Sequence, residues 1–168
     1  DCVIIGSGPA GYSAAIRAGQ LGMKTVLIER AKIGGMCLNW GCVPARVMLE
    51  SARVLQTIRG AGEFGIDFGE NAAVSFSWKR AVDRTGQVSE ELVGKIGTLL
   101  SRYGVEIIEG EGTVTGPGSV TVNNRNLETK AILIATGSVP ENVPKSVRDT
   151  ASAGAGRVIE LKKLFGEN

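Results

Sequence analysis

Histidine is absent from the 168-residue sequence, and cysteine and aromatic residues are scarce. Without histidine, the chain cannot form a Ser–His or Cys–His catalytic pair of its own, and it lacks the commonest general base and metal ligand. Aromatic residues make up 5% of the chain, which argues against a base-stacking surface for nucleic acid. Three cysteines are too few for a disulfide scaffold. A close pair of them therefore indicates metal binding or redox chemistry in a reducing compartment.

Long apolar runs and an excess of one charge are also missing. No segment approaches the roughly 20 apolar residues that a membrane-spanning helix needs, and the first residues do not form a charged and then apolar leader. The 19 basic and 17 acidic side chains nearly cancel, which does not favour nucleic acid or an acidic surface as a partner. We therefore expect a cytoplasmic protein that binds neither membranes nor nucleic acid.

Glycine is abundant, with 24 residues, and its spacing has no fixed period of the kind seen in fibrous repeats. Apolar runs at 2–5 and 25–28, with a helix-compatible segment at 9–22 between them, predict a βαβ unit in a parallel sheet. Further helices are predicted at 45–56 and 76–103, although three internal glycines weaken the second prediction.

Short apolar or β-branched runs later in the chain predict one further parallel strand and a small antiparallel meander, at 105–108, 112–115, 119–122 and 130–135. The predicted fold class is therefore α/β, a Rossmann-like domain over residues 1–140. Proline and small residues in 141–168 predict a linker-like tail, to which 157–165 could add a strand or a short helix.

A glycine motif follows the first apolar run and opens the first predicted helix, formed by Gly6, Ser7, Gly8, Pro9, Ala10 and Gly11. In a dinucleotide-binding G-x-G-x-x-G motif, Gly6 permits the tight turn, Gly8 lets the backbone approach a pyrophosphate, and Gly11 allows close helix packing. Glu29 follows about 20 residues later, where a carboxylate can bind an adenosine ribose and disfavours NADP. Because FAD and NAD share the ADP half, the motif leaves the dinucleotide open, and packing alone is the alternative role of its glycines.

A second motif, GGMCLNWGCVPAR, covers residues 34–46. Cys37 and Cys42 have four residues between them and precede a predicted helix, so they can close a small disulfide, and the helix N-terminus would stabilise a thiolate on Cys42. The alternatives are a structural disulfide and half of a zinc site, but four zinc ligands cannot be assembled without histidine or a second cysteine cluster. Cys2, among apolar neighbours, is expected to be a small buried hydrophobe.

Together these motifs resemble the class I pyridine nucleotide-disulfide oxidoreductases, most closely the dihydrolipoamide dehydrogenases. The resemblance rests on GSGPAG, Glu29, the cysteine motif and the ATGS segment at 135–138, which occur in the family's order. It implies an FAD-binding domain in which Cys42 is the charge-transfer thiolate against the isoalloxazine ring and Cys37 is the thiol that exchanges with the substrate. It also implies that FAD contacts extend beyond the glycine motif and Glu29 to Arg30, Gly35, Met36, Cys37, Gly41, Cys42, Arg46, Gly112, Ala135, Thr136 and Gly137.

At two positions in this set, the residue differs from the usual one in the family or has an alternative role. Arg46 stands where the family usually has a lysine near the reactive edge of the flavin; the positive charge is kept, but the guanidinium is larger and planar. Gly112 matches a family position against the adenine side, with an ordinary turn glycine as the alternative.

The resemblance also implies parts that this segment does not carry. Family members continue into a domain that binds NAD(H) and into an interface domain whose His–Glu pair acts across a homodimer, so the segment alone is expected to be inactive. The expected substrate is a dithiol or disulfide, with a lipoyl group favoured. Enzymes resembling mercuric reductase or glutathione reductase share the cysteine spacing and remain alternatives, as does an FAD-binding module without turnover.

Overall fold

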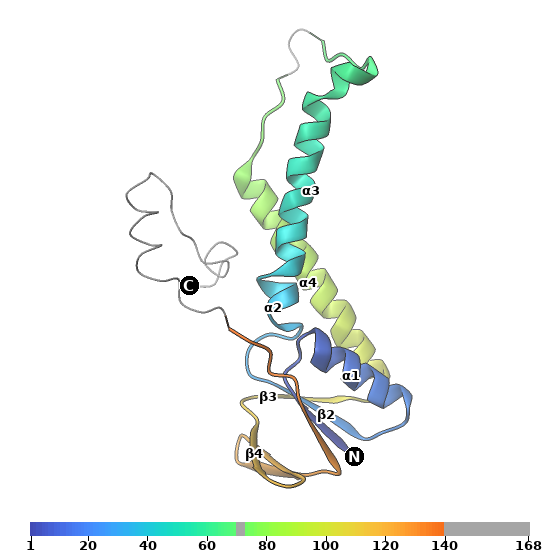
Figure 1. Ribbon diagram of the computed structural model, residues 1–168, viewed down its shortest axis with the longest axis vertical. Helices are drawn as coiled ribbons and strands as arrows, with labels where there is room; N and C mark the ends of the chain where they lie inside the picture. The colour runs from blue at the N-terminus through green and yellow to red at the C-terminus, as the bar shows by residue number, and fades with distance from the viewer. Residues whose placement is uncertain (70–72, 140–168) are drawn as a thin grey trace, which may run out of the picture.

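The computed structural model describes residues 1–69 and 73–139 (Figure 1). Within them, four parallel strands form a sheet in the order β3-β2-β1-β7. These strands are β1 (Cys2–Ile5), β2 (Thr25–Glu29), β3 (Glu106–Glu109) and β7 (Ala131–Ile134). Val3 of β1 lies in register with Val26 on one side and Ile132 on the other. The predicted Rossmann-like α/β fold is therefore confirmed.

A small antiparallel sheet covers one face of the parallel sheet. It consists of β4 (Thr113–Gly116), β5 (Ser119–Val122) and β6 (Arg125–Glu128), in that order. Val3 and Ile5 of β1 pack against Val120, Val122 and Leu127 of this meander. Because successive strand residues point to opposite faces, this face takes every second residue of β1.

Helices cover the opposite face. Ile4 of β1 and Leu27 of β2 are fully buried there beneath Ala15 of α1 (Pro9–Gln20) and Leu100 of α4 (Trp78–Arg102). Both faces of β1 are thus covered by protein. This double burial explains why its sequence is a continuous apolar run rather than an alternation of apolar and polar residues.

The number of later strands was predicted incorrectly. The run at 130–135 does not join the meander but pairs with β1 as a second additional parallel strand, and the meander is completed by β6, which was not predicted. In β6 only Leu127 is buried, so the segment has no apolar pattern to recognise. Its turn consists of Asn123 and Asn124, both with positive φ, which suits the two-residue turns that match the twist of a hairpin.

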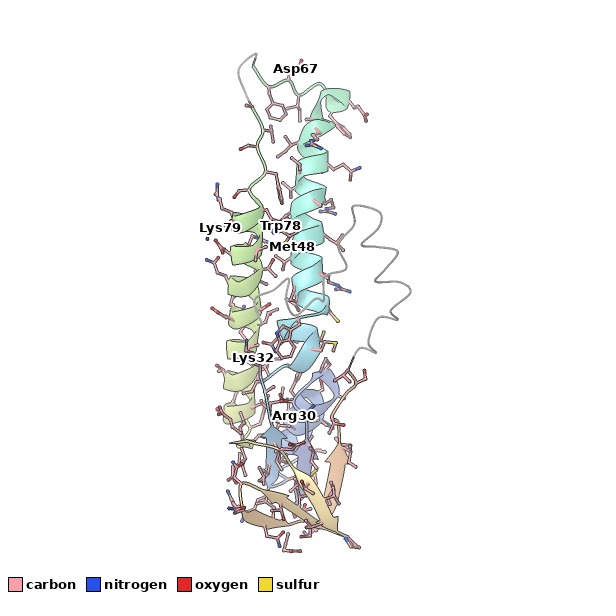
Figure 2. The ribbon with its side chains drawn as sticks, turned by 90° about the vertical axis from the view of Figure 1, so that its left-hand side faces the viewer. Arg30, Lys32, Met48, Asp67, Trp78 and Lys79 are labelled. Carbon is pink, nitrogen blue, oxygen red and sulfur yellow. The ribbon has the colours of Figure 1, made fainter. Side chains whose placement is uncertain are left out.

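The longest helices form a hairpin that projects from the sheet (Figure 1). α3 (Cys42–Arg59) packs along α4, and a 3-10 turn, η1 (Ala61–Phe64), follows α3. In Figure 2, Asp67 lies at the far end of this hairpin and Arg30 lies near the sheet. α3 starts three residues earlier than predicted, at Cys42, and α4 continues through its three glycines.

The predicted tail and the predicted lack of a membrane-spanning helix are the two remaining expectations about the fold. The predicted tail at 141–168, including the segment 157–165, lies outside the described residues. Across residues 1–69 and 73–139, no helix combines the length and the apolar character needed to cross a membrane.

Candidate functional site

The glycine motif lies at the carboxyl edge of the sheet, where the order of strands reverses. The chain steps from β1 to β2 and β3 on one side, and β7 then pairs with β1 on the other side. The turn Gly6–Gly8 leaves β1 at this point and leads into α1. In open α/β sheets, such a reversal leaves a crevice outside the strand ends, which is where ligands bind.

The three glycines of the motif have different surroundings. Gly6 has φ +99°, and a β-carbon there would lie 2.3 Å from the carbonyl oxygen of Ala135. A β-carbon on Gly11 would lie 1.7 Å from the carbonyl oxygen of Gly6, so α1 crosses the turn in direct backbone contact. A β-carbon on Gly8 would meet nothing within 4 Å. The backbone at Gly8 therefore borders open space at the start of α1.

The first turn of α1 can receive an anion at this space. Gly8 caps the helix without a side-chain hydrogen bond, Pro9 occupies the first turn, and the turn contains no acidic residue. The main-chain N–H groups of a helix start carry partial positive charge and bind phosphate. The residues present at this turn thus fit the pyrophosphate of a dinucleotide.

Glu29, at the end of β2, is tied to the glycine motif. Its Oε2 accepts hydrogen bonds from the main-chain N–H of Ser7 at 2.8 Å and from the Ser7 hydroxyl at 2.6 Å. Its Oε1 accepts the N–H of Ala31 at 2.8 Å. Burial raises the pKa of Glu29, but these hydrogen bonds outweigh burial and hold the pKa below its ordinary value. The carboxylate is therefore ionised near neutral pH and keeps further lone pairs for a ribose hydroxyl.

The two cysteines of the second motif lie side by side as free thiols. Cys37 is on the short helix α2 (Gly35–Asn39), and Cys42 is the first residue of α3. Their side chains share a hydrogen bond, and the main-chain N–H of Cys42 donates to the Cys37 sulfur. Two neighbouring thiols of this kind can close a disulfide when they are oxidised.

Charges and burial around Cys37 act in opposite directions. Burial raises the pKa of Cys37 most, followed by the neighbouring Cys42 side chain, whereas the Cys42 N–H and the charge of Arg46 lower it. The pKa remains above its ordinary value in sum. Arg46 is exposed one helical turn beyond Cys42. Its guanidinium is thus the cation that favours a thiolate at Cys37.

The cysteine segment is fastened to the glycine motif. The N–H of Gly34 donates to the carbonyl oxygen of Ser7 at 3.0 Å. A β-carbon on Gly35 would lie 2.9 Å from the α-carbon of Gly8, so the two glycine turns touch. Met36 follows as an exposed residue of α2, and Gly41 lies against its carbonyl group. Sequence motifs about 30 positions apart are therefore one spatial site.

The remaining predicted residues surround this site less tightly. Ala135 and Thr136 lie against Gly6, and Gly137, with φ +70°, follows them at the same edge. A β-carbon on Gly112 would contact the side chains of Ile5 and Ile28, so this glycine rests on the meander face of the sheet. Arg30 is exposed and pairs with Glu111 at 3.4 Å.

One residue between the cysteines, Asn39, was not predicted to have a role in the site, whereas Trp40 was expected either to shield the flavin or to pack in the core. Asn39 donates from its side-chain amide to two carbonyl groups, those of Ile33 and Gly35. Trp40 is 6% exposed, and the Lys32 ammonium lies 5.7 Å from the centre of its ring. The tendency of short amide side chains to bond nearby backbone was the signal available for Asn39.

A cavity of about 600 Å³ lies between α2, α4 and the carboxyl ends of β2 and β3. Glu29, Lys32, Trp40, Thr85, Ser89 and Glu109 are among its lining residues. The glycines of the first motif are not among its lining residues. In the described part of the chain, no three cysteine or acidic side chains gather closely enough to hold a metal ion.

Comparisons with known proteins agree with this arrangement. The pyridine nucleotide-disulphide oxidoreductase family matches residues 1–163. The dihydrolipoyl dehydrogenase of Acholeplasma laidlawii is 39% identical over 138 residues, which cover 82% of this chain and 40% of that protein. The dihydrolipoyl dehydrogenase of Chlorobaculum tepidum is 40% identical over 149 residues, which cover 86% of this chain and 31% of that protein. The chain thus spans less than half the length of these relatives.

A solved structure shows the same fold. It is the Cu(II) complex of RclA, an HOCl-induced flavoprotein disulfide reductase of Escherichia coli, and the TM-score is 0.68 at 24% sequence identity. The similarity covers 86% of this chain and 29% of RclA. At this identity the comparison supports the arrangement of helices and strands.

Proposed function

The chain belongs to the pyridine nucleotide-disulphide oxidoreductase family, and on that basis we propose that it is the FAD-binding segment of a dihydrolipoyl dehydrogenase-type enzyme. The observation that carries the proposal is the contact between the two motifs. Two hydrogen-bonded thiols lie in a segment whose Gly35 touches Gly8 of the dinucleotide motif. A redox-active pair beside a dinucleotide cradle is what flavin-linked disulfide exchange requires.

FAD would be held by the residues around the open space at Gly8. The N–H groups at the start of α1 would bind the pyrophosphate, and Glu29 would accept a hydrogen bond from the adenosine ribose. Arg30, Gly112 and the segment 135–137 would border the remaining parts of the cofactor. When bound, FAD supplies two-electron transfer between a nicotinamide and the cysteine pair.

The cysteines divide the thiol chemistry between them. We assign Cys37 as the thiol that attacks the substrate disulfide, as the order of the two cysteines in the family implies. Burial raises the pKa of Cys37, and the Cys42 N–H and the Arg46 charge offset part of this rise. Attack forms a mixed disulfide and releases one substrate thiol. Cys42 then attacks the Cys37 sulfur, which closes the Cys37–Cys42 bond and releases the second substrate thiol. Cys42 is also the thiol that we place against the flavin, since its side chain is exposed.

The partners follow from the same proposal. The chain has no histidine, so the acid–base group for thiol exchange comes from elsewhere in the protein or from a second subunit of a homodimer. NAD(H) would bind outside the FAD-binding segment, which we place at residues 1–140. A lipoyl group is the proposed substrate, and two working thiols suit the reducing cytoplasm.

Anaerobic titration of the full-length protein with dithionite tests the proposal. At partial reduction, we expect long-wavelength charge-transfer absorbance that disappears in the Cys42→Ser variant and persists in Cys37→Ser. Cys2→Ser is the matched control, because Cys2 lies in β1 and not beside the cysteine pair. FAD without any cysteine-dependent absorbance would reduce the protein to a flavin-binding module.

Substrate assays separate the related enzymes. The full-length protein should reduce lipoamide with NADH at a kcat/KM far above that for glutathione disulfide or Hg²⁺. Preference for either of the latter would retain the thiol roles but replace the proposed substrate. Loss of all three activities in both Cys37→Ser and Cys42→Ser, with full activity in Cys2→Ser, is the expected pattern.

A further inference from the structure

Asn39 ends the short helix that carries Cys37, and its side chain reaches back to the loop before that helix. The amide Nδ2 donates to the carbonyl oxygen of Ile33 at 3.0 Å and to that of Gly35 at 2.9 Å. Both side-chain N–H donors are thereby used within one segment. Asn39 closes the segment 33–39 into a loop with Cys37 inside it.

This closure matters because α2 has little stability of its own. The helix has five residues, far fewer than an isolated helix needs in water. Gly34, which precedes the helix, and Gly35, its first residue, have φ of +92° and +58°, and glycine permits such angles but also many others. Two side-chain hydrogen bonds across this glycine pair restrict an otherwise adaptable turn.

The same turn is attached to the dinucleotide motif. Gly34 donates its N–H to the carbonyl oxygen of Ser7, and Gly35 is in backbone contact with Gly8. A connected path therefore runs from Ser7 and Gly8 through the glycine pair to Asn39 and then to Cys37. Through this path, a fixed cradle can set the position of the cysteine.

We propose that Asn39 is a positioning residue that holds Cys37 in register with Cys42 and with the dinucleotide cradle through its bonds to Ile33 and Gly35. Asn39 touches neither sulfur through these bonds and acts only through the conformation of α2. The inference rests on the proposed thiol–disulfide function and adds a residue that sets the redox equilibrium of the pair.

The test measures that equilibrium in the full-length protein with glutathione buffers. In the reaction, the dithiol and one glutathione disulfide give the Cys37–Cys42 disulfide and two glutathione thiols, so bonds, protons and electrons balance. In Asn39→Ala, the thiols are less well pre-organised, and we expect the equilibrium constant for disulfide formation to fall about tenfold. This corresponds to a reduction potential about 30 mV less negative.

Two further variants sharpen the test. Asn39→Asp replaces the donors by acceptors that face two carbonyl groups, and we expect a fall at least as large as in Asn39→Ala. Asn124→Asp makes the same chemical change in the exposed turn between β5 and β6 and should leave the potential unchanged. FAD content and Tm are measured in every variant.

The outcomes separate this inference from the proposed function. If the unsubstituted protein shows charge-transfer absorbance that requires Cys42, but Asn39→Ala keeps the original potential, the positioning role is wrong and the proposed function stands. If Asn39→Ala loses FAD and cooperative unfolding, Asn39 supports the fold generally and the inference is also wrong. If the unsubstituted protein lacks that absorbance, the proposed function itself fails.

Discussion

The sheet end of the molecule and the helical hairpin contain the same types of residue, apolar side chains and glycines, but bury them to different extents. At the sheet end, Ile4 and Leu27 are 0% exposed, and Gly11 is pressed against backbone. On the hairpin, Leu49 is 68% exposed, and the space beside Gly94 is open. The sheet end therefore has a buried core, although Leu21 and Ile134 are exposed there. The hairpin presents more apolar side chains outward, at Val54, Phe64, Ile66, Phe68, Val74, Phe76 and Trp78.

The cysteine pair lies at the boundary between the sheet end and the helical hairpin. Cys42 begins α3, which leaves the covered sheet end and runs along the projecting hairpin (Figure 1). The segment that carries Cys37 is held by backbone contacts between the two glycine turns. Cys42 instead begins α3, a helix in which only Pro44 and Val47 are buried. Changes in the two regions should consequently differ in size.

Gly11→Ala should break the sheet end most severely. Its β-carbon would lie 1.7 Å from the Gly6 carbonyl oxygen, so α1 must move away from the turn. We expect a loss of more than about 4 kcal/mol in the free energy of unfolding. Urea denaturation followed by circular dichroism measures it, and a loss below about 1 kcal/mol would contradict the close contact.

Leu100→Ala and Leu49→Ala compare the same substitution in the two regions. Leu100 is fully buried beneath the sheet, so its truncation should leave a cavity and cost about 3 kcal/mol. Leu49 is exposed on α3, and its truncation should change stability by less than about 0.5 kcal/mol. Equal losses in urea titrations would show that the hairpin is covered in the intact protein.

Glu29→Gln tests the electrostatic part of the sheet end. Because the pKa of Glu29 is lowered in the folded state, its ionised form stabilises the fold above the unfolded pKa, and this contribution is lost as pH falls through the folded value. For this half-buried side chain, solvent screening limits the expected loss at pH 7 to about 1 kcal/mol. The stabilities of the two proteins should begin to converge as pH falls below 4.5 and should coincide once pH is below the lowered pKa of the folded state. Urea titrations from pH 7 to pH 3 measure this, and a constant difference would oppose the assignment.

Gly94→Ala should give the smallest effect, with the opposite sign. A β-carbon at this position in α4 meets nothing within 4 Å, and alanine favours the helix over glycine. We expect a gain of about 0.5 kcal/mol in stability. Thermal unfolding of Gly94→Ala, Gly11→Ala and the unsubstituted protein measures the difference. A Tm of Gly94→Ala below that of the unsubstituted protein would reveal an additional contact at the hairpin.

Periodic and locally encoded features were predictable from sequence. The strands β1 and β2 were located because burial on both faces of the sheet makes them continuous apolar runs. The helix between them was located because it buries one face in a regular pattern. The dinucleotide motif and the cysteine spacing identified the candidate site because each depends on residues close together in the chain. β6 was missed because its stability comes from pairing with β5 and from the two-asparagine turn, not from an apolar pattern.

The sequence by itself determined the order of the motifs, the α/β class and the absence of an internal histidine base. Only the tertiary structure decided that Ala135 closes against Gly6, that Gly35 touches Gly8, and that Asn39 clamps the turn carrying Cys37. The physical reason is that these contacts join backbone groups of different segments. Their distances depend on how the sheet and its helices pack, which no local pattern specifies.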